Sequence, residues 1–242
     1  MNEIFLLAMT RSGSTLLQRA INQTPGMLMY GEHGGMLRGF AAAYYGADFP
    51  CLEKHSRCEP AILRDKTTFR PCHSCIEADH LRGNFRYFIE STFNPCGSPR
   101  WGFKEVRYGR SENNTQTVDM LIEMFPTCKF ILLVRDPREQ IESQLSMKWS
   151  MPNDAFREWE NQFTFYSRLR RDHPDRCRMY HYEHLRDASR IFEWLQLECP
   201  VTRLFDDLPV TGATPGKCGI TKILRTNIEE VLLPMFGNHT YD

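Results

Sequence analysis

The chain has 242 residues, and its 30 Lys and Arg balance its 30 Asp and Glu, so the formal net charge at pH 7 is zero. This length suits one domain with a sizeable hydrophobic core. Neutrality excludes a broad basic surface of the kind that holds nucleic acid or anionic lipid. No apolar run approaches the ~20 residues of a membrane-spanning helix, and the first, residues 4–9, is too short for a signal peptide. We therefore predict a cytoplasmic protein without nucleic-acid or membrane partners.

The N-terminal residues predict a strand, a loop and a helix. Residues 4–9 form a continuous apolar run, which is typical of a strand buried on both faces of a parallel sheet. Residues 10–14 are a polar turn, and residues 15–22 show the helical spacing of apolar side chains. A Pro-Gly pair ends that helix before a short second strand at residues 27–30.

The same alternation continues along the chain. It predicts strands at residues 101–106, 129–134 and 178–182, and helices at residues 115–125, from residue 136 onward, and at residues 155–171. Strands that alternate with helices imply a three-layer α/β fold, in which helices flank both faces of a parallel sheet. We interpret residues 1–242 as a single domain, and residues 46–100, which break the alternation, as an insertion or a lid over the sheet edge.

Cysteines concentrate in this insertion. Five of the nine cysteines lie there, and in a reducing compartment thiols are expected more than a disulfide scaffold. Four of the five fall within 25 residues and have histidines nearby. A structural zinc site, disulfides and free thiols therefore all stay open for Cys51, Cys58, Cys72 and Cys75.

The turn after the first strand suits a phosphate group. A Gly-containing turn between a strand and a helix gathers unpaired N–H groups at the positive end of the helix. Gly13 stands where a Walker A loop has its second glycine, but Ala8 replaces the first glycine and Ser14 replaces the lysine. The positive charge is instead at Arg11. The turn makes the predicted sheet P-loop-like, although a plain Ser/Thr-rich helix cap with a solvated arginine is an alternative.

A second motif begins at the end of the strand at residues 129–134. Arg135 follows this strand, and Ser143 comes eight residues later, two turns into the next helix. A guanidinium group offers two parallel charge-assisted hydrogen bonds to a phosphate, and a hydroxyl adds a third donor. The alternative is an ordinary strand-end turn followed by an exposed serine.

Together these two motifs resemble the sulfotransferases that use 3'-phosphoadenylyl sulfate (PAPS), and among them the carbohydrate, tyrosylprotein and bacterial branches. The resemblance implies that Arg135 and Ser143 bind the 3'-phosphate of PAPS and of its product PAP, and that no catalytic metal is needed. It also implies a set of ligands for the 5'-phosphosulfate, which are Arg11, Ser12, Gly13, Ser14 and Thr15.

Three further residues match the family through shorter segments. Tyr182, in a Tyr-Glu-His-Leu segment, resembles a tyrosine that lies near the adenine, although a core position suits it equally. Lys104, near the end of the strand at residues 101–106, corresponds to a lysine that contacts the sulfonate, with a salt bridge to Glu105 or another neighbour as the alternative. Lys217 is the candidate for a basic C-terminal loop over the 3'-phosphate, but its segment departs from the family's Arg-Lys-Gly pattern.

The reaction also needs a base near the sulfur to take the proton of the acceptor. Glu32 follows the second strand, where the tyrosylprotein and related branches have a glutamate base. His33 is its competitor, since the cytosolic small-molecule enzymes use a histidine, and a helix-capping role for either residue is the remaining alternative. We predict Glu32 as the base, with Arg11 stabilising the leaving group.

The resulting hypothesis is a PAPS-dependent sulfotransferase. It moves a sulfuryl group to a hydroxyl, or alternatively to an amine, of a small-molecule or carbohydrate acceptor, as a monomer or a homodimer. Two other classes stay open, which are a P-loop nucleotide kinase and a non-catalytic PAP-binding protein.

Overall fold

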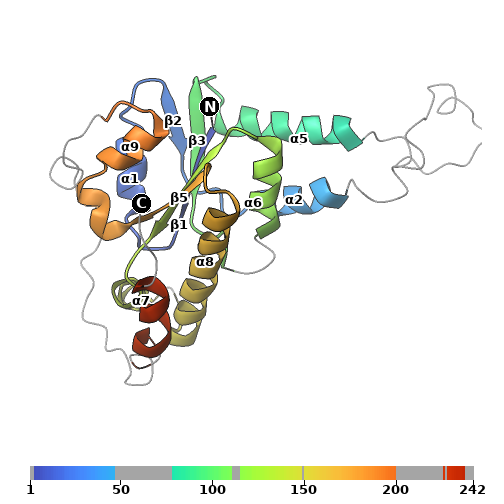
Figure 1. The fold of residues 1–242 in the computed structure, drawn as a ribbon. Coiled ribbons are helices and arrows are strands. Elements are labelled where there is room, and N and C mark those ends of the chain that lie inside the picture. The colour runs from blue at the N-terminus through green and yellow to red at the C-terminus, as the bar shows by residue number, and fades with distance from the viewer. Residues whose placement is uncertain are drawn as a thin grey trace, which may run out of the picture.

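The computed structural model describes residues 3–46, 78–110, 115–148, 150–199, 226 and 228–237. A five-stranded sheet with the order β2-β3-β1-β4-β5 runs through the middle of these residues, and every neighbouring pair of strands is parallel (Figure 1). The strands are β1 (Glu3–Ala8), β2 (Met27–Tyr30), β3 (Arg100–Glu105), β4 (Lys129–Val134) and β5 (Cys177–His181). All five strands predicted from the sequence are confirmed, with boundaries that differ by no more than one residue.

Helices cover both faces of the sheet (Figure 1). One face is covered by α1 (Ser14–Ile21) and α9 (Ser189–Leu195), with the short 3-10 helix η3 (Tyr182–Arg186) beside them. The other face is covered by α2 (Leu37–Gly46), α5 (Ala78–Phe93), α6 (Thr115–Met124) and α8 (Pro152–Asp172). Near α7 (Pro137–Ser146) lies a π-helical turn, η4 (Ile228–Leu232), that continues into α12 (Leu233–Gly237). The predicted three-layer α/β fold is therefore confirmed.

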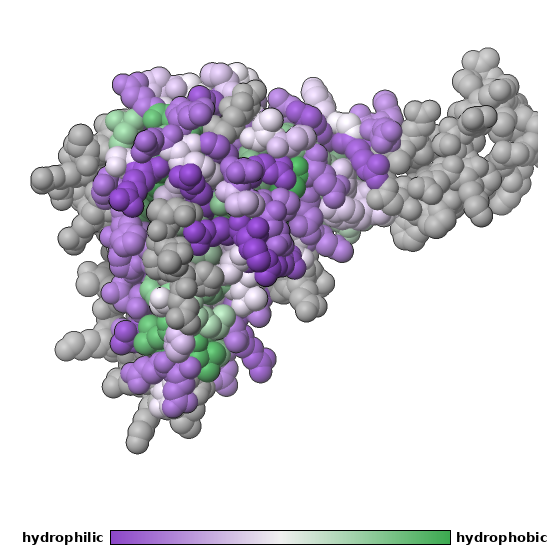
Figure 2. Space-filling model, viewed as in Figure 1, coloured by the Kyte–Doolittle hydropathy of each residue, from purple (hydrophilic) through white to green (hydrophobic). Residues whose placement is uncertain are grey.

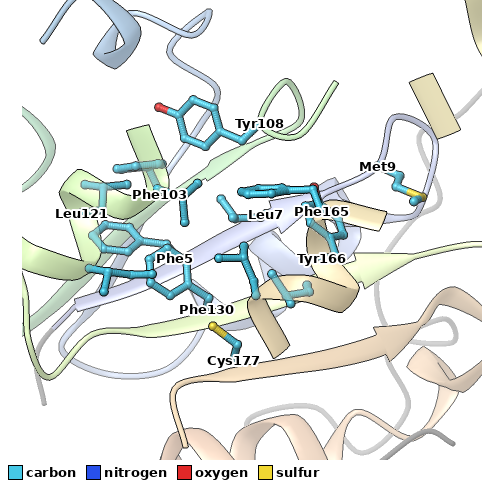
Figure 3. Packing of buried hydrophobic residues seen from close by; sticks show 14 of the residues in the cluster. Phe5, Leu7, Met9, Phe103, Tyr108, Leu121, Phe130, Phe165, Tyr166 and Cys177 are labelled. Carbon is cyan, nitrogen blue, oxygen red and sulfur yellow. The ribbon is translucent and has the colours of Figure 1, made fainter. Parts of the chain in front are cut away.

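The central strand β1 divides two hydrophobic cores because its side chains alternate between the faces of the sheet. Phe5 and Leu7 face the larger core, where the Phe5 ring lies 4.7 Å from the Phe103 ring and 5.3 Å from the Phe130 ring, centroid to centroid (Figure 3). Ile4 and Leu6 face the smaller core. Burial on both faces explains why this strand has a continuous apolar sequence instead of an alternating one.

The helix α5 belongs to the α/β core, although the sequence placed it within the predicted insertion. Ile89 and Phe93 are buried in the larger core, and the chain runs from the end of α5 to β3. The many polar residues of α5 hid this apolar stripe in the sequence. The interpretation as an insertion or lid stays a prediction for residues 47–77, which lie outside the described residues together with Cys51, Cys58, Cys72 and Cys75.

The face shown in Figure 2 is mostly hydrophilic, with apolar residues confined to small patches. None of the described helices combines the length and the apolar composition that crossing a membrane requires.

Candidate active site

The carboxyl ends of the five strands lead to one cleft of about 520 Å³. The segment that follows each strand contributes a side chain to its lining: Arg11 after β1, Glu32 after β2, Arg107 after β3, Arg135 after β4 and Tyr182 after β5. Ligands of open parallel sheets bind in this position, because the loops that follow the strands are free to carry polar groups. The cleft is therefore the candidate active site.

The turn between β1 and α1 forms one wall of the cleft. Gly13 has a φ of +79°, and a Cβ atom there would lie only 2.6 Å from Cδ2 of Tyr182, so the turn requires glycine for its backbone and for the ring packed against it. Ser12 is fully buried, and its hydroxyl donates to the carbonyl of Met9 at 2.5 Å. Its side chain shapes the turn from inside, whereas Ser14 and Thr15 line the cleft.

The two phosphate motifs, which are far apart in the sequence, meet in this cleft. The Arg11 side chain donates from Nε to the Ser143 hydroxyl at 2.9 Å, and the Arg135 side chain donates from Nη1 to the Arg11 carbonyl at 3.0 Å. The Arg135 guanidinium also lies over the Tyr182 ring, 4.4 Å from its centroid, and pairs with Glu139 at 2.7 Å. Because β1 and β4 are neighbours in a parallel sheet, both arginines belong to one site.

Two basic side chains contact the Glu32 carboxylate. Its Oε1 lies 2.8 Å from Nζ of Lys104, and its Oε2 lies 3.3 Å from Nη1 of Arg107. Lys104 is almost fully buried, and its Nζ also lies 3.3 Å from the Thr15 hydroxyl. Lys104 does form a salt bridge, but with Glu32 and not with its chain neighbour Glu105, because successive side chains of a strand point to opposite faces.

Comparison with known proteins identifies the family. Residues 3–200 match the family model described as "Sulfotransferase family". The chain belongs to the sulfotransferase family. The resemblance inferred from its two phosphate motifs is thus confirmed at the level of the family.

Solved structures of other sulfotransferases share the fold. The sulfotransferase domain of the olefin synthase from Synechococcus PCC 7002 has 19% sequence identity and a TM-score of 0.59, over 99% of this chain and 96% of that one. A sulfotransferase from Alicyclobacillus acidocaldarius has 14% identity and a TM-score of 0.51, over 98% and 93% of the two chains. No curated protein sequence matches this sulfotransferase.

The predicted site residues within the described part of the chain fall into three groups. Those that line the cleft of this sulfotransferase are Arg11, Gly13, Ser14, Thr15, Glu32, Arg135 and Tyr182. Lys104 and Ser143 are buried directly behind the lining and contact it. Ser12 and His33 are turned into the protein, and Lys217 lies outside the described residues.

His33 is held beneath the cleft. Its side chain is 5% exposed, its Nε2 lies 3.1 Å from the Tyr108 hydroxyl, and its ring packs against Phe103. Its Nδ1 lies 3.5 Å from Oε2 of Glu105, without the geometry of a hydrogen bond. Burial lowers the pKa of His33. The cleft lining therefore includes Glu32 and not His33.

Glu105 organises this region, and the sequence analysis missed it. The carboxylate is fully buried and accepts the backbone N–H groups of Gly35 at 3.0 Å, Val106 at 2.9 Å and Arg107 at 3.2 Å. The Arg107 guanidinium donates to it as well, at 2.8 Å. Burial raises the pKa of Glu105, but the charge of His33 and the hydrogen bonds outweigh that effect and leave the pKa below its ordinary value. Glu105 thereby ties the segment that contains Glu32 to the end of β3.

We expect acid to destabilise the sulfotransferase through His33. Its folded pKa is lower than its unfolded pKa of about 6.5, so its neutral form contributes stability that is complete above pH ~6.5 and is lost as the pH falls through the folded pKa. Thermal unfolding measured from pH 7.5 to pH 5 should show a smaller fall in Tm for His33→Gln than for the wild type. Equal slopes for His33→Gln and the wild type would contradict this assignment.

Several further polar residues of the cleft lie outside every sequence motif. They include Arg110, Gln144, Ser150 and Glu158, which come from the loop after β3, from α7, from the segment before α8 and from α8. No local pattern links positions so far apart in the chain, so only the fold brings them together.

Among the described residues, no group of three or more His, Cys, Asp or Glu side chains is placed to hold a metal ion. The described cysteines Cys96, Cys128 and Cys177 are free thiols.

Proposed function

We propose that this sulfotransferase takes its sulfuryl group from PAPS and transfers it to a hydroxyl, or alternatively to an amine, of a small-molecule acceptor. The observation that supports PAPS as the donor is the junction of Arg11, Arg135 and Ser143 beside the Gly13 turn. A doubly phosphorylated adenosine matches this junction, because it presents two separate phosphate groups to two separate basic side chains.

The residues present fit PAPS and PAP. The N-terminus of α1 and Arg11 suit the 5'-phosphosulfate, since backbone N–H groups and a positive helix end meet there. Arg135 and Ser143 suit the 3'-phosphate, which would replace Glu139 and Arg11 as their partners. The Tyr182 ring, which lines the cleft and covers Gly13, suits the adenine.

PAPS, when bound, supplies the sulfuryl group, which forms a bond to the acceptor oxygen as its bond to the phosphate oxygen breaks. The Glu32 carboxylate takes the acceptor proton. Arg11 and the N–H groups of the turn donate hydrogen bonds to the negative charge that grows on the phosphate side. Lys104 lies between Glu32 and Thr15. Its ammonium group there positions the base and stabilises the developing negative charge.

Replacement of Arg135 tests the donor site. Arg135→Ala should weaken PAP binding by about 100-fold, because two charge-assisted hydrogen bonds to a phosphate are lost. Isothermal titration calorimetry with PAP measures the change, and ATP with Mg²⁺ in the same titration should bind the wild type less tightly than PAP does.

Arg138 provides the matched control for this experiment. It lies three positions later, in the first turn of α7, its side chain is 52% exposed, and it does not line the cleft, so Arg138→Ala should retain the wild-type PAP affinity. PAP affinity that is unchanged in Arg135→Ala, or ATP binding tighter than PAP binding, would contradict the proposed donor.

A further inference from the structure

Among the polar side chains of the cleft that have no task in the proposed donor site, four are considered together. They are Thr10, Arg110, Gln144 and Glu158, here called the polar wall. They come from the start of the turn after β1, from the loop after β3, from α7 and from α8. The donor site uses the other end of the turn, where Tyr182 covers Gly13.

Arg110 is fixed in place within the polar wall. Its Nε donates to the Val106 carbonyl at 3.1 Å, its Nη2 donates to the Thr10 hydroxyl, and its Nη1 lies 3.5 Å from Oε2 of Glu158. The two charged side chains are about one-quarter exposed. A carboxylate has about four acceptor positions, so Glu158 retains capacity for hydroxyl donors from a ligand.

Gln144 supplies an independent sign of a ligand. Its side chain lines the cleft, the residue is 2% exposed, and its Oε1 is buried with no hydrogen-bond partner among the described residues. A buried amide oxygen without a partner costs about 1–3 kcal/mol, and because Gln144 lines the cleft, a donor group of a ligand bound there would recover that cost. The group that satisfies Oε1 must be an O–H or N–H donor.

The chemistry of the wall selects a class of ligand. Gln144 Oε1 and the Glu158 carboxylate accept hydrogen bonds, while the Arg110 guanidinium donates them. A phenol or another flat apolar acceptor needs apolar walls. The Arg110 guanidinium is paired with the Glu158 carboxylate, so the wall carries no net charge that would favour an anionic acceptor. A molecule with several hydroxyl groups matches both the acceptors and the donor, because each hydroxyl can donate and accept.

We propose that the polar wall binds a polyhydroxylated acceptor of the sugar type. This inference rests on the proposed function, since the acceptor must lie beside the donor. Arg107 provides the link: it contacts Glu32, and its carbonyl accepts the backbone N–H of Arg110 at 3.3 Å. A ligand held by Arg110 therefore lies next to the turn that also positions the base.

Gln144→Met tests the proposal, because methionine keeps the size of glutamine and removes the acceptor oxygen. We expect about a tenfold weaker binding of methyl glycosides to the PAP-bound enzyme, measured by saturation-transfer NMR, and a similar rise in their KM, with unchanged PAP affinity. Gln140 provides the matched control. It lies one turn earlier on α7 and is fully buried with an unpartnered amide, but it does not line the cleft, so Gln140→Met should leave glycoside binding unchanged.

Glu158→Gln, at a partly exposed position, gives a second test that does not depend on core packing, and it should raise the same KM. If PAP binds but methyl glycosides do not, or if both variants bind them as the wild type does, the polar wall is not the acceptor site and the proposed function still stands. If PAP itself does not bind, the proposed function fails and the acceptor proposal fails with it.

Discussion

Replacement of Glu32 by glutamine is expected to lower kcat by about 100- to 10,000-fold, the usual contribution of a positioned general base. Glutamine retains an oxygen that accepts from Lys104, so the fold and the PAP affinity should stay close to those of the wild type. Only the ability to take a proton is lost. Release of PAP in the presence of a methyl glycoside acceptor measures kcat, and calorimetry measures PAP binding.

His33→Gln is the informative comparison for this variant. His33 lies beneath the cleft against Tyr108 and Glu105, so its replacement should cost stability and leave most of the turnover. Wild-type kcat in Glu32→Gln, combined with a large loss in His33→Gln, would transfer the role of base to the histidine.

The strands of the sheet were predictable because each is a short run of mostly apolar residues, which is easy to recognise in the sequence. Residues 129–134 are apolar at five of six positions and correspond to β4 without any shift of boundary. The meeting of Arg11 with Arg135 was also predictable, since the carboxyl ends of parallel strands lie at one edge of a sheet.

The sequence could not reveal the contacts that depend on strand order. β3 lies between β2 and β1, and this order brings Lys104 to Glu32, which is 72 positions away, instead of to Glu105. The same order places Glu105 below the segment after β2, where it binds the N–H of Gly35. Gln144 and Glu158 were missed for a similar reason, because nothing in the chain around either residue indicates a shared cleft.

Glu105→Gln is expected to lower the free energy of unfolding by about 3 kcal/mol, the typical cost of removing one partner from a buried charged network. Glutamine would leave the Arg107 guanidinium without its partner and would set an amide N–H₂ against the backbone N–H groups that now bind a carboxylate oxygen. Urea unfolding measures the loss. Asp172→Asn is the control, because Asp172 also pairs with an arginine at 2.9 Å but lies at the surface, where such pairs contribute less than about 1 kcal/mol.

The same variant separates a positioning role from a purely structural one. Glu105 reaches the active site through Arg107, which touches Glu105 and Glu32 at once. A positioning role therefore predicts that Glu105→Gln lowers kcat in the folded enzyme, and that adding Arg107→Gln lowers it little further, since both changes interrupt one connection. Independent, multiplying effects on kcat would show that Glu105 stabilises the fold without positioning Glu32.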